Sequence, residues 1–274
     1  MYKLANWVDQ TKINKITLSL NPRAIDYFMD NPDHINWPML SKNEGAYELL
    51  IQNQNQNQEK IIWGFMSSNP SMIQLLCNNL DKVNWCELSK NPAAIDVLLH
   101  YQDKINWIRF SENTHPLAID FLSKNPDKID WTSLSWNSSA INILSKNPDK
   151  INFRMLSANP AAIELLKQHP NKIDWVFLSK NSNHEAIEML KANPTKFSWY
   201  YLCGNRNPEA IEMLRANPSK IDWNFISQNP NIFVYDYEKI AKRISMFHEE
   251  LIAKALHPSR IAMWLENGMD YDDL

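Results

Sequence analysis

The chain has 274 residues, with 28 Lys+Arg against 31 Asp+Glu and a formal net charge of −3. This mild acidity argues against a general affinity for nucleic acid or anionic membranes. Three cysteines make no disulfide framework and indicate a reducing compartment. Only 4 glycines are present, which disfavours glycine-rich phosphate loops and nucleophile elbows. The 11 tryptophans and 33 asparagines are both in excess and need an architectural explanation.

The first residues lack the apolar run and cleavage site of a signal peptide, and no apolar stretch approaches the roughly 20 residues that span a membrane. We therefore expect a protein that is not secreted and does not insert into membranes. In chain order, we expect an N-terminal cap over residues 1–12, a repeat region over 13–233, and a C-terminal helical cap with an acidic tail over 234–274.

The repeat region is recognised by an aromatic slot that recurs mostly every 22 residues, as between Trp63 and Trp85, with several spacings of 24 and one of 26. Lys15 occupies this slot in a degenerate first repeat. The slot is otherwise filled by Trp37, Trp63, Trp85, Trp107, Trp131, Phe153, Trp175, Trp199 and Trp223. Internal repetition at this period is typical of solenoid architectures.

Each repeat is expected to hold two short helices. The residue before the aromatic slot is usually Asn, Asp or Ser, which are N-cap residues, so a first helix should carry Trp131 and Leu134 inward. Six residues after the slot stands an Asn, often followed by Pro as in Asn159-Pro160, which predicts the start of a second helix. Its Ala-Ile-x-x-Leu pattern supplies a buried face.

The predicted fold is an all-α solenoid of about ten short helix-pair repeats with a C-terminal helical cap. At about 9–10 Å per layer it would be elongated, on the order of 90–100 Å long, with partly exposed end repeats. The rival interpretation is a leucine-rich repeat, since its length range includes 22 and Leu-Ser-x-Asn imitates its strand and asparagine ladder. Missing leucines and recurring cap residues count against it.

Outside the regular repeat, irregular segments are expected at the surface. The 24-residue spacings carry two extra residues, such as Thr114-His115, and the 26-residue spacing holds an amide-rich loop over 52–58. Beyond residue 233, Asp236 should cap a helix to about Leu256, and a second helix should follow Pro258 and end near Gly268. The acidic tail over 270–274 should be loosely held.

No residue is predicted to be catalytic, to bind a cofactor or to bind a metal. His248-Glu249-Glu250 lacks the second His of a zinc-protease helix, and the three cysteines have no metal-ligand spacing. A lysine recurs three residues before the aromatic slot, and an acidic residue recurs after the Ile of the second helix. The lysines could line a phosphate-binding groove, but the overall acidity favours two solvated edges and no nucleic-acid partner.

The tryptophans recur at the architectural period and are therefore interpreted as structural core: Trp37, Trp63, Trp85, Trp107, Trp131, Trp175, Trp199 and Trp223. Two residues after the slot, the last four repeats carry apolar side chains: Met155, Phe177, Tyr201 and Phe225. This stripe either docks a protein partner or is buried by curvature of the array, and the sequence does not decide between the two.

The unit Lys-Ile-(Asn/Asp)-Trp-x-x-Leu-Ser-x-Asn-Pro-x-Ala-Ile, seen at Lys128–Trp131 and Asn159–Ile163, resembles repeat proteins abundant in giant viruses of amoebae. The closing segment from His257 to Gly268 is similar to the end of such proteins. The resemblance implies no enzymatic activity. It implies a location in the virion or in the host cytoplasm at the viral factory.

We therefore expect a non-catalytic structural or protein-interaction scaffold, a minor virion or capsid-associated protein or an assembly protein, with viral structural proteins or a host factor as partner. One alternative is a host-directed adaptor that binds a host protein during infection. Another is a leucine-rich-repeat-like binding module.

Overall fold

The computed structural model describes residues 1–53 and 61–267, and these divide into two compact bodies. The larger, here called the repeat body, spans Leu4–Phe233, and the smaller, the terminal body, comprises Met1–Lys3 with the chain from Val234 onward. The expected amide-rich loop begins inside a helix, since Gln52 and Asn53 belong to α4, and its remainder lies outside the described residues. The expected acidic tail and Gly268 also lie outside them.

Each of the ten repeats opens with a short helix, preceded in nine cases by a side chain that accepts a backbone N–H. Asp130, for example, accepts from the N–H of Ser133 at 2.7 Å. The exception is Ile62, whose aliphatic side chain has no atom that could accept a hydrogen bond. These first helices are α1 (Lys15–Leu18), α3 (Trp37–Leu40), α5 (Trp63–Met66), α7 (Trp85–Ser89), α9 (Trp107–Phe110), α11 (Trp131–Trp136), α13 (Phe153–Ser157), α15 (Trp175–Leu178), α17 (Trp199–Cys203) and α19 (Trp223–Ile226).

Nine repeats continue into a second helix. These are α2 (Ile25–Asp30), α4 (Tyr47–Asn53), α6 (Ile73–Cys77), α8 (Ile95–His100), α10 (Pro116–Lys124), α12 (Ile141–Ser145), α14 (Ile163–Lys167), α16 (His184–Lys191) and α18 (Pro208–Arg215). These second helices begin later than the predicted start at the Asn. In several repeats a 3-10 turn such as Pro92–Ala94 separates the Asn from the α-helix. Where two residues are inserted, His115, Asn183 or Asn207 caps a longer helix instead.

The core consists of the residues three positions after the aromatic slot and of the Ala and Leu of the second helix. Leu134, Ala140 and Leu144 are all fully buried, and the other repeats follow the same pattern. A helical segment stands wherever a leucine-rich repeat would place its strand, so that alternative is wrong. The prediction of a repeat protein built from short helices is confirmed.

A buried asparagine joins each repeat to the preceding one. The side-chain amide of Asn159 donates to the carbonyl of Ser135 at 3.1 Å and to that of Asn137 at 3.0 Å, while its oxygen accepts from the N–H of Ala161. The same three bonds are made by the asparagine ladder: Asn21, Asn43, Asn69, Asn91, Asn113, Asn137, Asn159, Asn181, Asn205 and Asn229.

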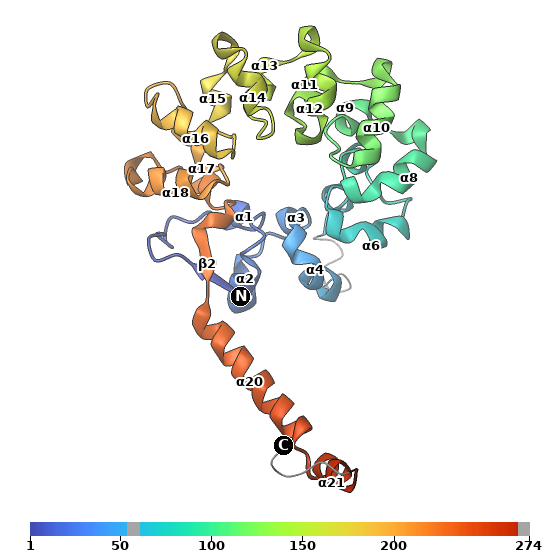
Figure 1. Ribbon diagram of the computed structural model, residues 1–274, viewed down its shortest axis with the longest axis vertical. Coiled ribbons are helices and arrows are strands. Elements are labelled where there is room, and N and C mark those ends of the chain that lie inside the picture. The colour runs from blue at the N-terminus through green and yellow to red at the C-terminus, as the bar shows by residue number, and fades with distance from the viewer. Residues whose placement is uncertain (54–60, 268–274) are drawn as a thin grey trace. The chain divides into compact units, whose positions relative to one another are not determined.

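The asparagine ladder has no free end. Asn21 of the first repeat donates to the carbonyls of Ser227 and Asn229 in the tenth, at 3.0 and 2.8 Å. Figure 1 shows α1 lying next to the last repeats of the circuit. The expectation of an elongated array with exposed end repeats is therefore wrong, because the asparagine of the first repeat makes the same bonds to a neighbouring repeat as those of the others.

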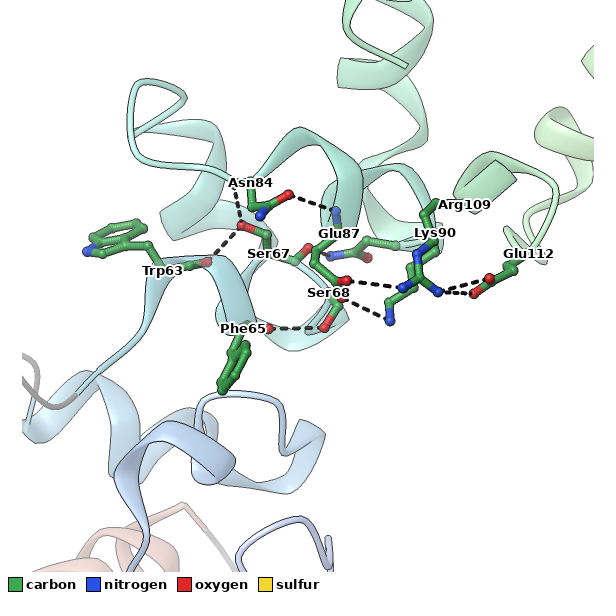
Figure 2. Close-up of polar contacts among 10 residues, drawn as sticks. Trp63, Phe65, Ser67, Ser68, Asn84, Glu87, Lys90, Arg109 and Glu112 are labelled. Carbon is green, nitrogen blue, oxygen red and sulfur yellow. Dashed lines mark hydrogen bonds and ion pairs between the residues drawn. The ribbon is translucent and has the colours of Figure 1, made fainter. Parts of the chain in front are cut away.

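A second set of bonds runs beside the ladder through the Ser four residues after the aromatic slot. Ser67 donates to the carbonyl of Trp63 at 2.8 Å and accepts from the N–H of Asn84 in the next repeat at 2.9 Å (Figure 2). Cys203 takes this place in the ninth repeat, where its sulfur accepts from the N–H of Asp222 at 3.3 Å. The chain of bonds closes where the N–H of Asn14 donates to Ser227 at 3.0 Å.

The terminal body contains a two-stranded sheet that the sequence analysis did not anticipate, formed by the ends of β1 (Tyr2–Leu4) and β2 (Phe233–Tyr235). The rings of Tyr2 and Tyr235 stack at 4.9 Å. Two helices follow, α20 (Tyr237–Ala255) and α21 (Pro258–Glu266), and Asp236 caps the first as predicted. No helix of the described residues combines the length and apolar character needed to cross a membrane.

Candidate protein-interaction surface

Because every first helix has the same orientation in its repeat, the residues two positions after the aromatic slot form one surface row. In chain order this row comprises Thr17, Met39, Phe65, Glu87, Arg109, Ser133, Met155, Phe177, Tyr201 and Phe225. Unlike the ladder, the row changes chemistry from one repeat to the next. It is therefore the candidate surface for a site that differs from repeat to repeat.

The stripe predicted at the end of this row is only partly open to solvent. Phe177 is buried, with 6% of its surface exposed, whereas Met155, Tyr201 and Phe225 are half-buried. The rings of Phe177 and Tyr201 lie 5.8 Å apart, and those of Tyr200 and Phe225 stack at 4.8 Å. Neighbouring rings thus pack on one another, with one face of several left to solvent.

Gly204 makes room for this packing. A Cβ atom at Gly204 would lie 2.6 Å from the Cζ atom of the Phe225 ring. Any side chain there would force the ring away from α17. The absence of a side chain at Gly204 therefore lets the Phe225 ring approach the backbone.

A lysine lies among the aromatic side chains of this stripe. The Nζ atom of Lys180 is 4.2 Å from the ring centroid of Tyr201, 4.9 Å from that of Phe177 and 5.3 Å from that of Trp136. Arg154 covers the Phe177 ring at 4.3 Å. We call Trp136, Arg154, Phe177, Lys180 and Tyr201 the cation–aromatic patch.

The charge of Lys180 is not matched by a carboxylate. Burial, and then the nearby Arg154 guanidinium, lower the pKa of Lys180 below its ordinary value. Among residues 1–53 and 61–267 it has no ion-pair partner, and Arg154 reaches Asp174 only at 3.8 Å. Trp136 is 48% exposed beside it. Aromatic faces attract the ammonium group but leave its hydrogen-bond donors available.

The same row is self-neutralised four repeats earlier (Figure 2). Glu87 pairs with Lys90 at 2.9 Å and with Arg109 at 3.6 Å, and Arg109 pairs with Glu112 at 3.0 Å. Burial acts to raise the pKa of Glu87, but Lys90, Arg109 and Lys42 outweigh it and hold the pKa below its ordinary value. This stretch offers little unmatched charge to a partner.

The tryptophans predicted as structural core are half-buried, and the deepest positions belong to the residues three after them. Among residues 1–53 and 61–267, the ring contacts of the tryptophans are with other aromatic types, as between Trp107 and Phe121 at 5.8 Å, and none joins two indoles. Five of the rings lie under the lysine of the next repeat in the circuit and so line the junction between repeats: Trp63, Trp107, Trp131, Trp175 and Trp223.

The repeated lysines cover these aromatic rings. Lys150 lies 4.8 Å from the ring of Trp131, in the preceding repeat, and the same contact is made by Lys82, Lys128, Lys172 and Lys196. Lys12 makes it with Trp223 of the tenth repeat at 5.8 Å. These lysines therefore help to join repeats, in addition to lying at a solvated edge.

One trio of side chains has metal-ligand character. The nearest ligand atoms of His184, Glu188 and Glu209 lie within 4.8 Å of one another. Lys191 already bonds to both of these glutamates, and Lys167 bonds in the same way to Glu164 and Glu185 one repeat earlier. The recurrence identifies the trio as part of an ion pair between consecutive second helices.

Sequence reasoning found Phe177 and Tyr201 but missed Trp136, Arg154 and Lys180. Trp136 and Lys180 occupy the same repeat position, five after the aromatic slot, with Ala158 between them. That alternation of large, small and large residues is a signal in the sequence. It could have predicted that the two long side chains meet over the small one.

The fold and this surface define the protein as a helical repeat protein with a patterned surface row. Comparison with protein-family models, with curated proteins and with solved structures found no match to this chain.

Proposed function

We propose that the repeat body is a closed α-solenoid that acts as a non-catalytic protein-interaction scaffold. The cation–aromatic patch is its binding site. The observation that carries this proposal is the half-buried ammonium group of Lys180, which lies against three rings and has no carboxylate partner among the residues that the structure describes.

The partner chemistry follows from the patch. An acidic side chain placed over Lys180 and Arg154 would supply the missing anion, and an adjacent apolar side chain would cover Trp136 and Tyr201. Aromatic and arginine side chains are the residue types that dominate the energetics of protein interfaces. Because the repeats hold these side chains on short capped helices, little conformational entropy is lost when a partner binds.

The proposal is tested with a phage-displayed random peptide library panned on the wild-type chain. We expect enrichment of peptides in which Asp or Glu adjoins an aromatic or aliphatic residue. Lys180→Glu should weaken their synthetic versions by about tenfold or more, because attraction becomes repulsion. The affinity should also fall as the pH rises through the lowered pKa of Lys180.

Lys90→Glu is the matched control, since Lys90 occupies the same repeat position but is already paired with Glu87. It should leave peptide affinity unchanged. Equal loss in both variants, undiminished binding by Lys180→Glu, or no enrichment of acidic peptides would contradict the proposed site.

A further inference from the structure

Helix α20 of the terminal body presents an apolar stripe that is exposed over most of its length in the part of the chain that the structure describes. Ile240, Ile244, Phe247 and Leu251 follow one another at spacings of four, three and four residues, which places them on one face of the helix. Ile244 is 62% exposed, Phe247 52% and Leu251 65%. A stripe of this spacing is typical of a helix that packs lengthwise against a second helix.

Charges flank this stripe asymmetrically. Arg243 and Glu250 each precede a stripe residue by one position, so both lie along the same side of it. Ala241, His248 and Ala255 lie along the other side, and two of these three are small. One flank of the stripe therefore carries a positive charge at Arg243 and a negative charge at Glu250. The other flank, with its two alanines, permits close approach of a second helix.

We propose that α20 pairs with α20 of a second copy of this chain, antiparallel and about a two-fold axis near the middle of the stripe. This arrangement places Arg243 next to Glu250 of the second copy and Glu250 next to Arg243 of the second copy. Ile240 then packs near Leu251 of the other helix, and Ile244 near Phe247. A parallel pair would bring Arg243 beside His248 and would leave Glu250 beside an alanine.

The two-fold symmetry makes the interface self-complementary, as closed dimers require. The stripe spans about 17 Å at 1.5 Å per residue, so the dimer should be weak, with a dissociation constant on the order of micromolar. Its consequence is that each dimer carries two repeat bodies. A partner with two acidic segments would then bind with increased avidity.

The test is sedimentation velocity on the full chain from about 5 to 200 µM at low ionic strength. Wild type should shift from monomer to dimer across this range. Arg243→Glu and Glu250→Arg should each weaken self-association by about tenfold or more, because each variant places like charges together. An equimolar mixture of the two variants should dimerise again, and so should the double variant R243E/E250R.

Matched controls come from the opposite face of the same helix. Lys242→Glu and Glu249→Lys make the same net-charge changes on exposed residues away from the stripe and should leave self-association unchanged. Leu251→Asp should abolish the dimer without altering the thermal transition of the chain.

Three results would overturn the proposal. One is a wild-type chain that remains monomeric at the highest concentration. Another is a mixture of R243E and E250R that fails to associate. The third is a fall in the thermal stability of the monomer on Leu251→Asp with no change in self-association, which would show that the stripe packs within one chain.

Discussion

Two sets of repeat positions differ in how much their residue types vary. One is the buried seam between repeats, formed by the asparagine ladder and by the Ser four residues after each aromatic slot. The other is the surface row two residues after the slot. The seam repeats one Asn in all ten repeats and one Ser in nine of them, because these residues make the same bonds to their neighbours. The row, by contrast, includes Glu87, Ser133 and Phe177 at equivalent positions. Uniform residues therefore mark the positions that join one repeat to the next, and variable residues mark positions that make no bond common to all repeats.

Asn159→Ala should produce the largest change in stability, because it removes a residue of the seam. The carbonyls of Ser135 and Asn137 and the N–H of Ala161 would lose their partner in a site with no solvent exposure. We expect a loss of about 3 kcal/mol in unfolding free energy, measured by urea denaturation. Asn142→Ala, on an exposed face of α12, should change it by less than about 0.5 kcal/mol. Equal effects would show that the ladder is not what holds the repeats together.

Phe177→Ser should have the next largest effect, because Phe177 belongs to the surface row but is buried like the residues of the seam. The ring is 6% exposed, so its loss should cost about 2–3 kcal/mol by thermal or urea unfolding. Tyr201→Ser, at a half-buried ring, should cost about half as much. A cost for Tyr201→Ser as large as that for Phe177→Ser would mean that the row is core throughout.

Glu87→Gln tests the self-neutralised part of the row. Since the pKa of Glu87 in the folded chain lies below its ordinary value of 4.5, its ion pairs stabilise the fold fully above pH 4.5. That stabilisation is lost as the pH falls through the lowered pKa. The variant should therefore be less stable by about 1 kcal/mol at pH 7, and the difference should shrink in acid. A difference that is constant with pH would assign the effect to packing.

Cys203→Ser should have the smallest effect and the opposite sign. Nine repeats place a serine here, whose hydroxyl donates to a carbonyl and accepts an N–H. Burial raises the pKa of the Cys203 thiol, so it remains protonated at neutral pH. Restoring the hydroxyl should stabilise the chain by about 0.5–1 kcal/mol, read from the thermal midpoint. A loss of stability would indicate that this junction has adapted to the larger sulfur.

Much of the repeat could be predicted from residues close together in the sequence. The cap before Trp131 and the buried positions of Leu134 and Ala140 follow from cap chemistry and helical spacing. The second role of the asparagine was missed, because an N-cap explains its side-chain oxygen but not its two N–H donors. Those donors bond to another repeat, 22–28 residues away in nine repeats and 206 and 208 residues away for Asn21.

The sequence by itself determined the period, the helix caps and the buried face of each repeat, because these depend on contacts within a few residues. Tertiary structure alone decided that Asn21 meets Ser227 and that Arg154 covers the Phe177 ring. Closure depends on a small rotation between consecutive repeats that accumulates over the whole circuit. No single repeat encodes that sum, so the ring emerges only when all ten repeats are packed together.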